Sequence, residues 1–216
     1  FAFCREREAV RCRRAAGEPA PWSEDEIFQK ARFLNVFRED DRGSQALLRF
    51  AEPVAEQLER LVHGLFFARW CNRQSTLDAL SADLLESPEA LVSALESLPE
   101  HPWCNWTAYP VGPVRWQGQR YNRWDSATDL FRRIRPELTK TICAAGGDVI
   151  KATEAVNGLL HMDNDFPIFM AVMDLAWVRP DVIDPASPVP TGIGAAPFLD
   201  RLEAALGAKD HQETAQ

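Results

Sequence analysis

One short segment of the chain combines arginine and asparagine at helical spacing. If residues 29–42 form an α-helix, four polar side chains lie within an arc of roughly 120°: Arg32, Asn35, Arg38 and Arg42. A guanidinium binds two phosphate oxygens at once, and an asparagine amide both donates to and accepts from a base edge. The segment therefore predicts a polar face that binds a phosphate-bearing nucleic acid. The alternative is an ordinary amphipathic helix with surface ion pairs.

Two further segments carry candidate contacts. Arg69 and Asn72 stand three residues apart, hence on one helix face, and they either line a pocket or cap the helix end. Aromatic and arginine side chains alternate over 103–124, which suits stacking on unpaired bases or, alternatively, closure of a core. The residues of this second segment are Trp103, Trp106, Tyr109, Trp116, Tyr121 and Trp124, with Arg115, Arg120 and Arg123.

The charge distribution permits a nucleic-acid partner although the total is acidic. The formal net charge is −8, which lowers non-specific affinity for a polyanion. The basic residues are concentrated in 1–14 and 115–140, whereas 74–100 is acidic. A basic surface can therefore coexist with the acidic total.

The number and spacing of cysteine, histidine and glycine residues bear on disulfides, metal sites and nucleotide cofactors. Five cysteines without CxxC spacing and four scattered histidines predict neither a disulfide framework nor a zinc site. Because no glycine-rich phosphate loop is present either, we expect no bound metal and no nucleotide cofactor. No stretch approaches the roughly 18 uncharged apolar residues of a membrane span, and the N-terminus lacks a secretory pattern. These features predict a cytoplasmic protein without a membrane partner.

The elements that must position these residues read as helices. Gly17 ends a first pattern, Ser23 begins a capping box, and Ser87-Pro88 repeats a start signal. The expected helices are 1–16, one from Ser23, 54–65, 87–98, 125–134, 147–160, 166–177 and 194–206. Only 107–122 suggests a short hairpin or an ordered loop. The sequence thus predicts an all-α chain, 1–216 forming a single helical domain or two closely packed lobes.

The segment from Leu160 to Asp184 resembles the helix-hairpin-helix of base-excision DNA glycosylases. A short turn precedes an apolar helix, and Asp184 falls where that family places an aspartate at the active-site mouth. The hairpin is degenerate, because Met162-Asp163-Asn164 replaces the Gly-x-Gly of the family. Asp163 and Asp165 would also repel a phosphate.

Taken as a whole, the chain resembles the α-glutamyl/putrescinyl thymine pyrophosphorylase family, whose phage members are also called amino acid:DNA transferases. The resemblance runs through Phe3–Arg7, Pro21-Trp22-Ser23, Ile27-Phe28-Gln29, Arg32–Arg38 with Asp41, Arg69 with Asn72, and Gly192–Ala195 with Leu199. It implies a DNA glycosylase-like helical fold. It also implies an enzyme that displaces pyrophosphate from 5-pyrophosphoryloxymethyl-uracil in DNA with an amino acid or polyamine.

The resemblance also implies roles for individual residues. The cations expected to hold the pyrophosphate are Arg32, Arg38 and Arg69. The carboxylates expected to accept the proton of the attacking ammonium are Asp184, Asp174 and Asp41. The amides expected to read the base edge are Asn35 and Asn72. Glu6, between Arg5 and Arg7, would orient an arginine or the amine, and Trp22 would stack on the base or pack under the Pro19–Pro21 break.

Three other functions remain open on the sequence. A DNA glycosylase would use Asp184 to support base loss, although 161–178 contains no lysine for lyase chemistry. A non-catalytic DNA-binding module would need only the basic segments. A protein-interaction domain would use the aromatic-rich surface.

Overall fold

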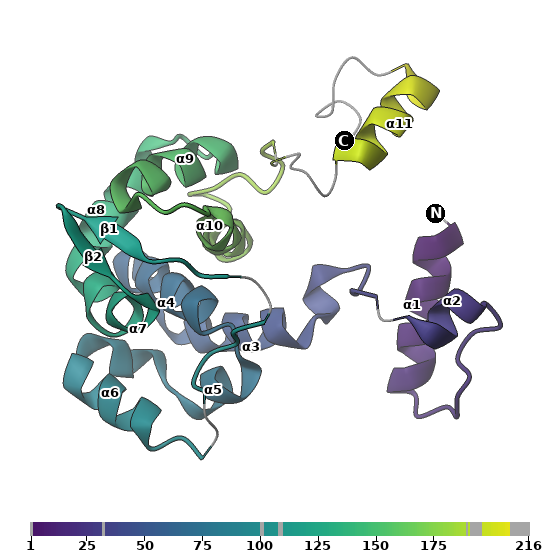
Figure 1. The fold of residues 1–216 in the computed structure, drawn as a ribbon, viewed down its shortest axis with the longest axis horizontal. Coiled ribbons are helices and arrows are strands. Elements are labelled where there is room, and N and C mark those ends of the chain that lie inside the picture. Colours follow the sequence, from purple (N-terminus) through teal and green to yellow (C-terminus); the bar gives the residue numbers. More distant parts are fainter. Residues whose placement is uncertain are drawn as a thin grey trace.

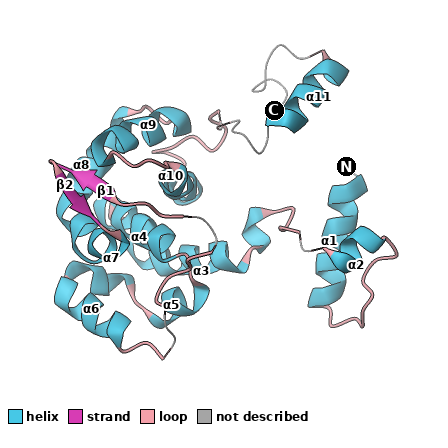
Figure 2. Cartoon of the chain, viewed as in Figure 1, coloured by secondary structure: helices cyan, strands magenta, loops and turns pink. Residues whose placement is uncertain are grey.

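The computed structural model describes residues 2–31, 33–99, 102–107, 110–188, 190 and 196–207. Helices account for most of these residues, and the one sheet among them is a two-stranded hairpin (Figure 2). The expectation of an all-α chain is confirmed at this level. The closer likeness to DNA glycosylases, and the division into one domain or two lobes, stay predictions.

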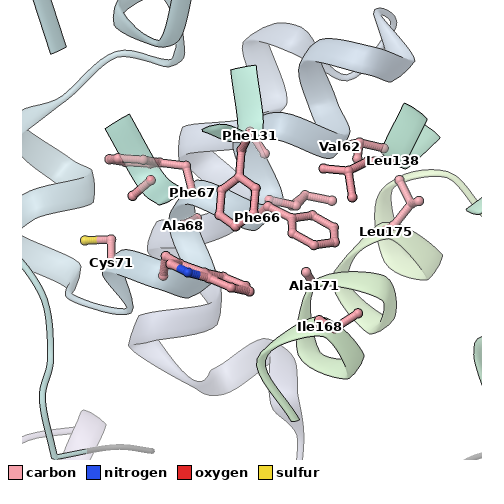
Figure 3. Close-up of a cluster of buried hydrophobic side chains, with 14 of the residues drawn as sticks. Val62, Phe66, Phe67, Ala68, Cys71, Phe131, Leu138, Ile168, Ala171 and Leu175 are labelled. Atoms are coloured by element: carbon pink, nitrogen blue, oxygen red, sulfur yellow. The ribbon is translucent and has the colours of Figure 1, made fainter. Parts of the chain in front are cut away.

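The core is built around α4 (Leu58–Cys71), which is buried after its first turn. Every residue from Leu61 to Cys71 is buried, so α4 has no polar stripe and must be covered on all sides. It packs against α3 (Arg42–Ala51), α8 (Phe131–Ala144) and α10 (Phe166–Val178), as Figure 1 shows. The contacts are aromatic and aliphatic: Phe66 and Phe131 meet edge to face, and Leu175 of α10 lies nearby (Figure 3).

The remaining helices complete a layer around α4. α9 (Val149–Leu160) packs on both α8 and α10, and its C-cap His161 has a φ of 45°. α5 (Gln74–Ala79) packs on α3, and α6 (Pro88–Glu96) follows the 3₁₀ turn η3 (Ala82–Glu86). Ser87 caps α6 as its sequence signal predicts, accepting a hydrogen bond from the Ala90 amide.

A short hairpin and a long composite helix connect these layers. β1 (Val114–Trp116) pairs antiparallel with β2 (Gln119–Tyr121) through a turn in which Gln117 and Gly118 both have positive φ. α7 (Arg123–Asp125) and a π-helical turn, η4 (Ser126–Leu130), then run directly into α8. The expected hairpin within 107–122 is confirmed, and the expected helix at 125–134 is the start of a longer one.

The N-terminal helices lie beside this body. α1 (Ala2–Ala15) and α2 (Glu26–Lys30) are held together by a cluster of three rings, Phe3, Phe28 and Phe33. The segment that contains the 3₁₀ turn η1 (Arg38–Asp40) joins them to α3 (Figure 1). At the other end, α11 spans Ala196–Leu206. No helix among the described residues has the length and apolar character needed to cross a bilayer.

The expected helix face at 29–42 is wrong. α2 ends at Lys30 and residues 33–37 are not helical. Arg7 of α1 donates to the main-chain oxygens of Phe33 and Leu34, and the Asn35 amide donates to the Asp40 carbonyl. These side-chain bonds compete with the helix ladder. Asn35, Arg38 and Arg42 therefore do not form one helix face, and Arg32 lies outside the described residues.

A buried histidine gives the fold an acid-sensitive point. His63 of α4 is 1% exposed, and neither ring nitrogen has a hydrogen-bond partner among the described residues. Burial first, and then the charge of Arg135, lowers its pKa to about 3, while Glu86 acts in the opposite direction and Arg132 and Arg60 add to the lowering. The imidazole is therefore neutral and unsatisfied in the native state.

We expect His63→Leu to stabilise the protein, and more strongly in acid. Removing an unsatisfied buried polar group gains about 1 kcal/mol at neutral pH. Below pH 6.5 His63 binds a proton in the unfolded chain but stays neutral in the native state. The free energy of unfolding of the wild type therefore decreases as the pH falls from 6.5 towards 3. At pH 5 the variant should gain roughly 2 kcal/mol more. Urea unfolding of both proteins at pH 7 and pH 5 measures this; an equal difference at the two pH values contradicts it.

Candidate functional site

Three of the residues singled out in the sequence meet in one buried cluster. Asp174, on the side of α10 that faces α4, is 1% exposed. Its two oxygens accept from Arg69 of α4, at 2.5 Å from Nε and 2.7 Å from Nη2. Oδ1 also accepts from Nη2 of Arg38, in η1, at 2.5 Å. We call Arg38, Asp174 and Arg69 the arginine–aspartate cluster.

The cluster carries a surplus positive charge at its outer side. Two guanidiniums face one carboxylate, and Asp174 and Arg69 are buried, whereas the side chain of Arg38 is 26% exposed. The guanidinium of Arg38 also lies over the Trp177 ring, 5.5 Å from its centroid. Asp174 thus fixes the direction of Arg38 and leaves a rigid cation at the surface. Such an arrangement suits an anion with several oxygens.

An open cavity of about 960 Å³ adjoins the end of α4. Asn72, the C-cap of α4, has a φ of 44°, and its side-chain amide makes no hydrogen bond to any described residue. Trp106, 59% exposed, lines the same cavity, with the guanidinium of Arg123 5.0 Å from its ring centroid. We call this space the α4 cavity. It offers an aromatic face and an uncommitted amide, the two groups that recognise a base.

Asp41 follows Arg38 on the same segment and lines the α4 cavity. It lies three residues after Arg38, as Asn72 lies three residues after Arg69. Its Oδ2 accepts from the Ser44 amide at 2.8 Å and so caps α3. Its Oδ1 has no hydrogen-bond partner within the described ranges. Asp41 is thus a carboxylate at the cavity with one oxygen available.

Asn35 and Arg7 contact each other and have a structural part. Nη2 of Arg7 donates to Oδ1 of Asn35 at 2.7 Å, in addition to its bonds to the main chain of 33–34. The Asn35 amide nitrogen is committed to Asp40. Both residues therefore shape the segment that presents Arg38. Neither contacts the arginine–aspartate cluster.

Three other expected site residues lie elsewhere on the N-terminal helices. Arg5 is exposed on α1. Glu6 pairs with Arg13 at 3.4 Å, and Trp22 donates to the Glu18 carbonyl with Arg14 over its ring. Glu6 and Trp22 line a separate cleft. Arg32, as well as the 192–195 part of the family resemblance, lies outside the described residues.

Asp184 lies in a turn beyond α10. It accepts from the Ala186 amide, and its own amide donates to the Gly147 carbonyl, 2.9 Å away. This pairing fastens the end of α10 to the turn before α9. Asp184 is exposed and has no contact with Arg38 or Arg69. Its role as a proton acceptor stays a prediction.

The hairpin between α9 and α10 is closed by its own side chains. The Met162 amide donates to Oδ1 of Asn157, and the Phe166 amide to Oδ1 of Asn164. Arg115 pairs with Asp163 and donates to the His161 carbonyl. The arginine that could attract a phosphate is thereby neutralised. The geometry gives the helix-hairpin-helix no support as a phosphate clamp.

Most of the aromatic residues at 103–124 belong to the core rim. Trp103 is buried, stacks on Phe67 and meets Trp124 edge to face. The guanidinium of Arg133 lies over the rings of Trp116 and Tyr121. Tyr109 lies outside the described residues. Trp106 alone in this set combines large exposure with a place on a described cavity.

Sequence reasoning missed Trp177 and did not weigh Trp106 as a residue of its own. Trp177 belongs to the outer side of α10 together with Phe166, which is also exposed. The spacing of Phe166, Met170, Met173 and Trp177 is helical and apolar, so it reads as core. Trp106 is one of several aromatic residues in 103–124, and its sequence context does not predict that its side chain is exposed. Only the fold separates these two from their buried neighbours.

The fold and site define a mostly helical protein with a buried arginine–aspartate cluster and, at the end of α4, an open cavity. Residues 1–99 match a family model described as the helical domain of 5-hmdU DNA kinase. The matched part includes α1, η1, α3 and α4, and therefore Arg38, Asp41, Arg69 and Asn72. No curated protein and no solved structure matches the chain.

Proposed function

We propose that this chain is an enzyme of DNA thymine modification. It would bind 5-pyrophosphoryloxymethyl-uracil in DNA and replace the pyrophosphate with an amine from an amino acid or a polyamine. The observation that carries the proposal is the arginine–aspartate cluster, which holds a partly exposed cation on the segment that also contributes Asp41 to the α4 cavity. The match to the helical domain of 5-hmdU DNA kinase supports the choice of DNA and of a 5-substituted uracil.

The cluster suits the leaving group. Pyrophosphate departs with the electron pair of the broken carbon–oxygen bond, so its negative charge on the departing oxygen grows along the reaction. A cation that is already fixed in place stabilises this charge without reorganisation. Arg38 is fixed by Asp174 and is partly exposed, whereas Arg69 lies behind it. Arg38 is therefore the direct contact, and Asp174 and Arg69 are positioning residues.

The α4 cavity suits the base. Trp106 presents an exposed ring on which a flipped pyrimidine can stack. The amide of Asn72 can donate to a uracil carbonyl oxygen and accept from the ring N–H. Both residues line the same space, and the cavity is large enough for a nucleotide with a substituent on C5.

Asp41 is the best-placed proton acceptor. An ammonium has no lone pair, so it must lose a proton before its nitrogen attacks the methylene carbon. The nitrogen–carbon bond then forms as the carbon–oxygen bond to pyrophosphate breaks. Of the three aspartates considered, Asp174 is committed to two arginines and Asp184 lies in a distant turn of the chain. Asp41 has a free oxygen at the cavity and would take the proton.

We expect Asp41→Asn to lower the transfer rate by a factor of about 10² to 10⁴. Asparagine caps a helix about as well as aspartate does, so the melting temperature should change little. Single-turnover rates and thermal melting of the two proteins separate chemistry from folding. A variant with the wild-type rate would exclude Asp41 as the proton acceptor.

The reaction itself is tested by product analysis. The protein is incubated with DNA that contains 5-pyrophosphoryloxymethyl-uracil and with a mixture of amino acids and polyamines. Mass spectrometry of the nucleosides should show an amine adduct, with release of pyrophosphate. An abasic site would indicate a glycosylase, and unchanged DNA in spite of tight binding would indicate a binding module.

A second candidate is favoured by the family match itself. The chain could present 5-hydroxymethyl-uracil in DNA for phosphorylation, since the matched model is a domain of a 5-hmdU DNA kinase. The same cation would then hold the newly formed phosphate ester. Incubation of 5-hydroxymethyl-uracil DNA with ATP, with and without this protein, tests it. A phosphate ester that depends on the protein supports this candidate over the transferase.

A further inference from the structure

A second, strongly basic cleft lies between α1 and α3. Its volume is about 520 Å³, and four arginines line it: Arg7, Arg11, Arg14 and Arg42. Two carboxylates, Asp40 and Asp41, and the amides of Asn35 and Gln45 complete the lining. We call this space the arginine cleft. Four positive charges face two negative ones, so the cleft attracts anions.

Of the two carboxylates in the arginine cleft, Asp40 is paired with an arginine and Asp41 has one oxygen engaged. Asp40 pairs with Nε of Arg11 at 3.1 Å, and Arg11 also forms a bidentate pair with Glu8. Asp41 caps α3 with one oxygen. Arg14 and Arg42 have no acidic partner among the described residues, and both are exposed. These two arginines are therefore the cations available to a ligand.

One wall of the cleft is rigid. Arg7 is 8% exposed, and its Nε and Nη2 bind the main chain and the side chain of 33–35. Its Nη1 makes no hydrogen bond within the described ranges, although the residue lines the cleft. The guanidinium of Arg14 lies against the face of Trp22, 4.9 Å from the ring centroid. Ordered guanidiniums of this kind bind phosphate oxygens with little loss of side-chain entropy.

We propose that the arginine cleft binds backbone phosphates of the DNA strand that carries the modified base. This inference rests on the proposed function for the identity of the polyanion. The segment 35–41 contributes Asn35 and Asp40 to the cleft and sends Arg38 to Asp174 on α10. A strand held in the cleft therefore contacts the same segment that carries the cation proposed to hold the pyrophosphate. Contacts with phosphates position a strand without reading its sequence.

The test is the salt dependence of binding to an oligonucleotide with ordinary thymine. Log K should fall linearly with log salt concentration for the wild type. In the double variant Arg14→Ala/Arg42→Ala the slope should be shallower by about one for each arginine that contacts a phosphate. Lys140→Ala, which removes one exposed positive charge from α8, should leave the slope unchanged.

Folding and function are controlled separately. Arg14→Gln/Arg42→Gln keeps long polar side chains, so it should melt like the wild type while showing the same shallower slope. The proposal for the arginine cleft is contradicted if both double variants have the wild-type salt slope, or if the wild type does not bind DNA. If the wild type transfers the amine but the slope is the same in the double variants, only the proposal for the arginine cleft is wrong. If the double variants have a shallower slope but the wild type catalyses neither transfer nor phosphorylation, only the proposed function is wrong.

Discussion

Asp174→Asn should destabilise the protein by about 3–5 kcal/mol, because it removes the only negative charge of the arginine–aspartate cluster. Arg69 is 5% exposed, and its Nε and Nη2 both donate to Asp174. The amide has nearly the same volume, so the loss comes from removing the carboxylate charge that faces two guanidiniums and not from a cavity. At about 2–4 °C per kcal/mol, the melting temperature should fall by about 10 °C. Differential scanning calorimetry measures it.

Two further variants separate charge from packing. Asp184→Asn makes the same chemical change at an exposed turn and should melt within a degree or two of the wild type. Arg69→Met/Asp174→Leu removes the buried cation together with its partner, and should recover part of the lost stability. If Asp174→Asn melts like Asp184→Asn, the buried ion pair does not hold α4 to α10.

Arg38→Ala should lower the transfer rate by a factor of about 10² to 10³, the usual effect of losing one group that stabilises developing charge. The fold should survive, since Asp174 keeps its two bonds to Arg69 and the Arg38 side chain is partly exposed. Single-turnover kinetics at saturating amine measures the rate. Melting curves of the same samples check the fold.

Two control variants test whether the effect depends on the shape of the Arg38 side chain and on its position in the protein. Arg38→Lys keeps the charge but loses the fork, so it should retain part of the rate. Arg60→Ala removes an arginine of α4 that pairs with Asp83 and Glu86, and should transfer at the wild-type rate. Wild-type activity in Arg38→Ala would remove the cluster from the reaction.

The sequence predicts much of the helical content because its signals are local. Gly17, with a φ of 75°, ends α1 as expected, and Ser87-Pro88 starts α6. The apolar run of α10 is also found at its expected place, Phe166–Val178. Caps and periodicity involve residues within about four positions of one another, so a single sequence contains them.

The non-helical backbone at 33–37 and the geometry of the site depend on residues distant in the sequence. Residues 29–42 have helical periodicity, yet Arg7, 26 to 28 positions away, captures their main chain. Arg38 and Arg69 meet Asp174 across 136 and 105 positions. Helical spacing singles out Arg38 and Arg69, and the family resemblance adds Asp174, but neither predicts that the three side chains meet. The resemblance implies that all three belong to one active site, and the fold shows that their side chains are in contact.

The same limit explains why the choice among the aspartates changes. The place of Asp184 after a hairpin, which makes it a candidate beside Asp174, is a local pattern of the sequence. In the fold it binds the Ala186 amide, whereas Asp41 lines the α4 cavity with one oxygen free. A free oxygen is a property of the packed structure. The sequence could place Asp41 near Arg38 but not at a cavity.

The most direct test of the central claim is a binding comparison in the absence of amine. Wild type and Arg38→Ala are titrated with two oligonucleotides that differ in one group, 5-pyrophosphoryloxymethyl-uracil or 5-hydroxymethyl-uracil. The account predicts that the wild type prefers the pyrophosphate form by about tenfold or more, roughly the 1.4 kcal/mol of one charge-assisted contact. Arg38→Ala should lose this preference and bind the hydroxymethyl form as before. Equal affinity of the wild type for both, or an undiminished preference in Arg38→Ala, would contradict it.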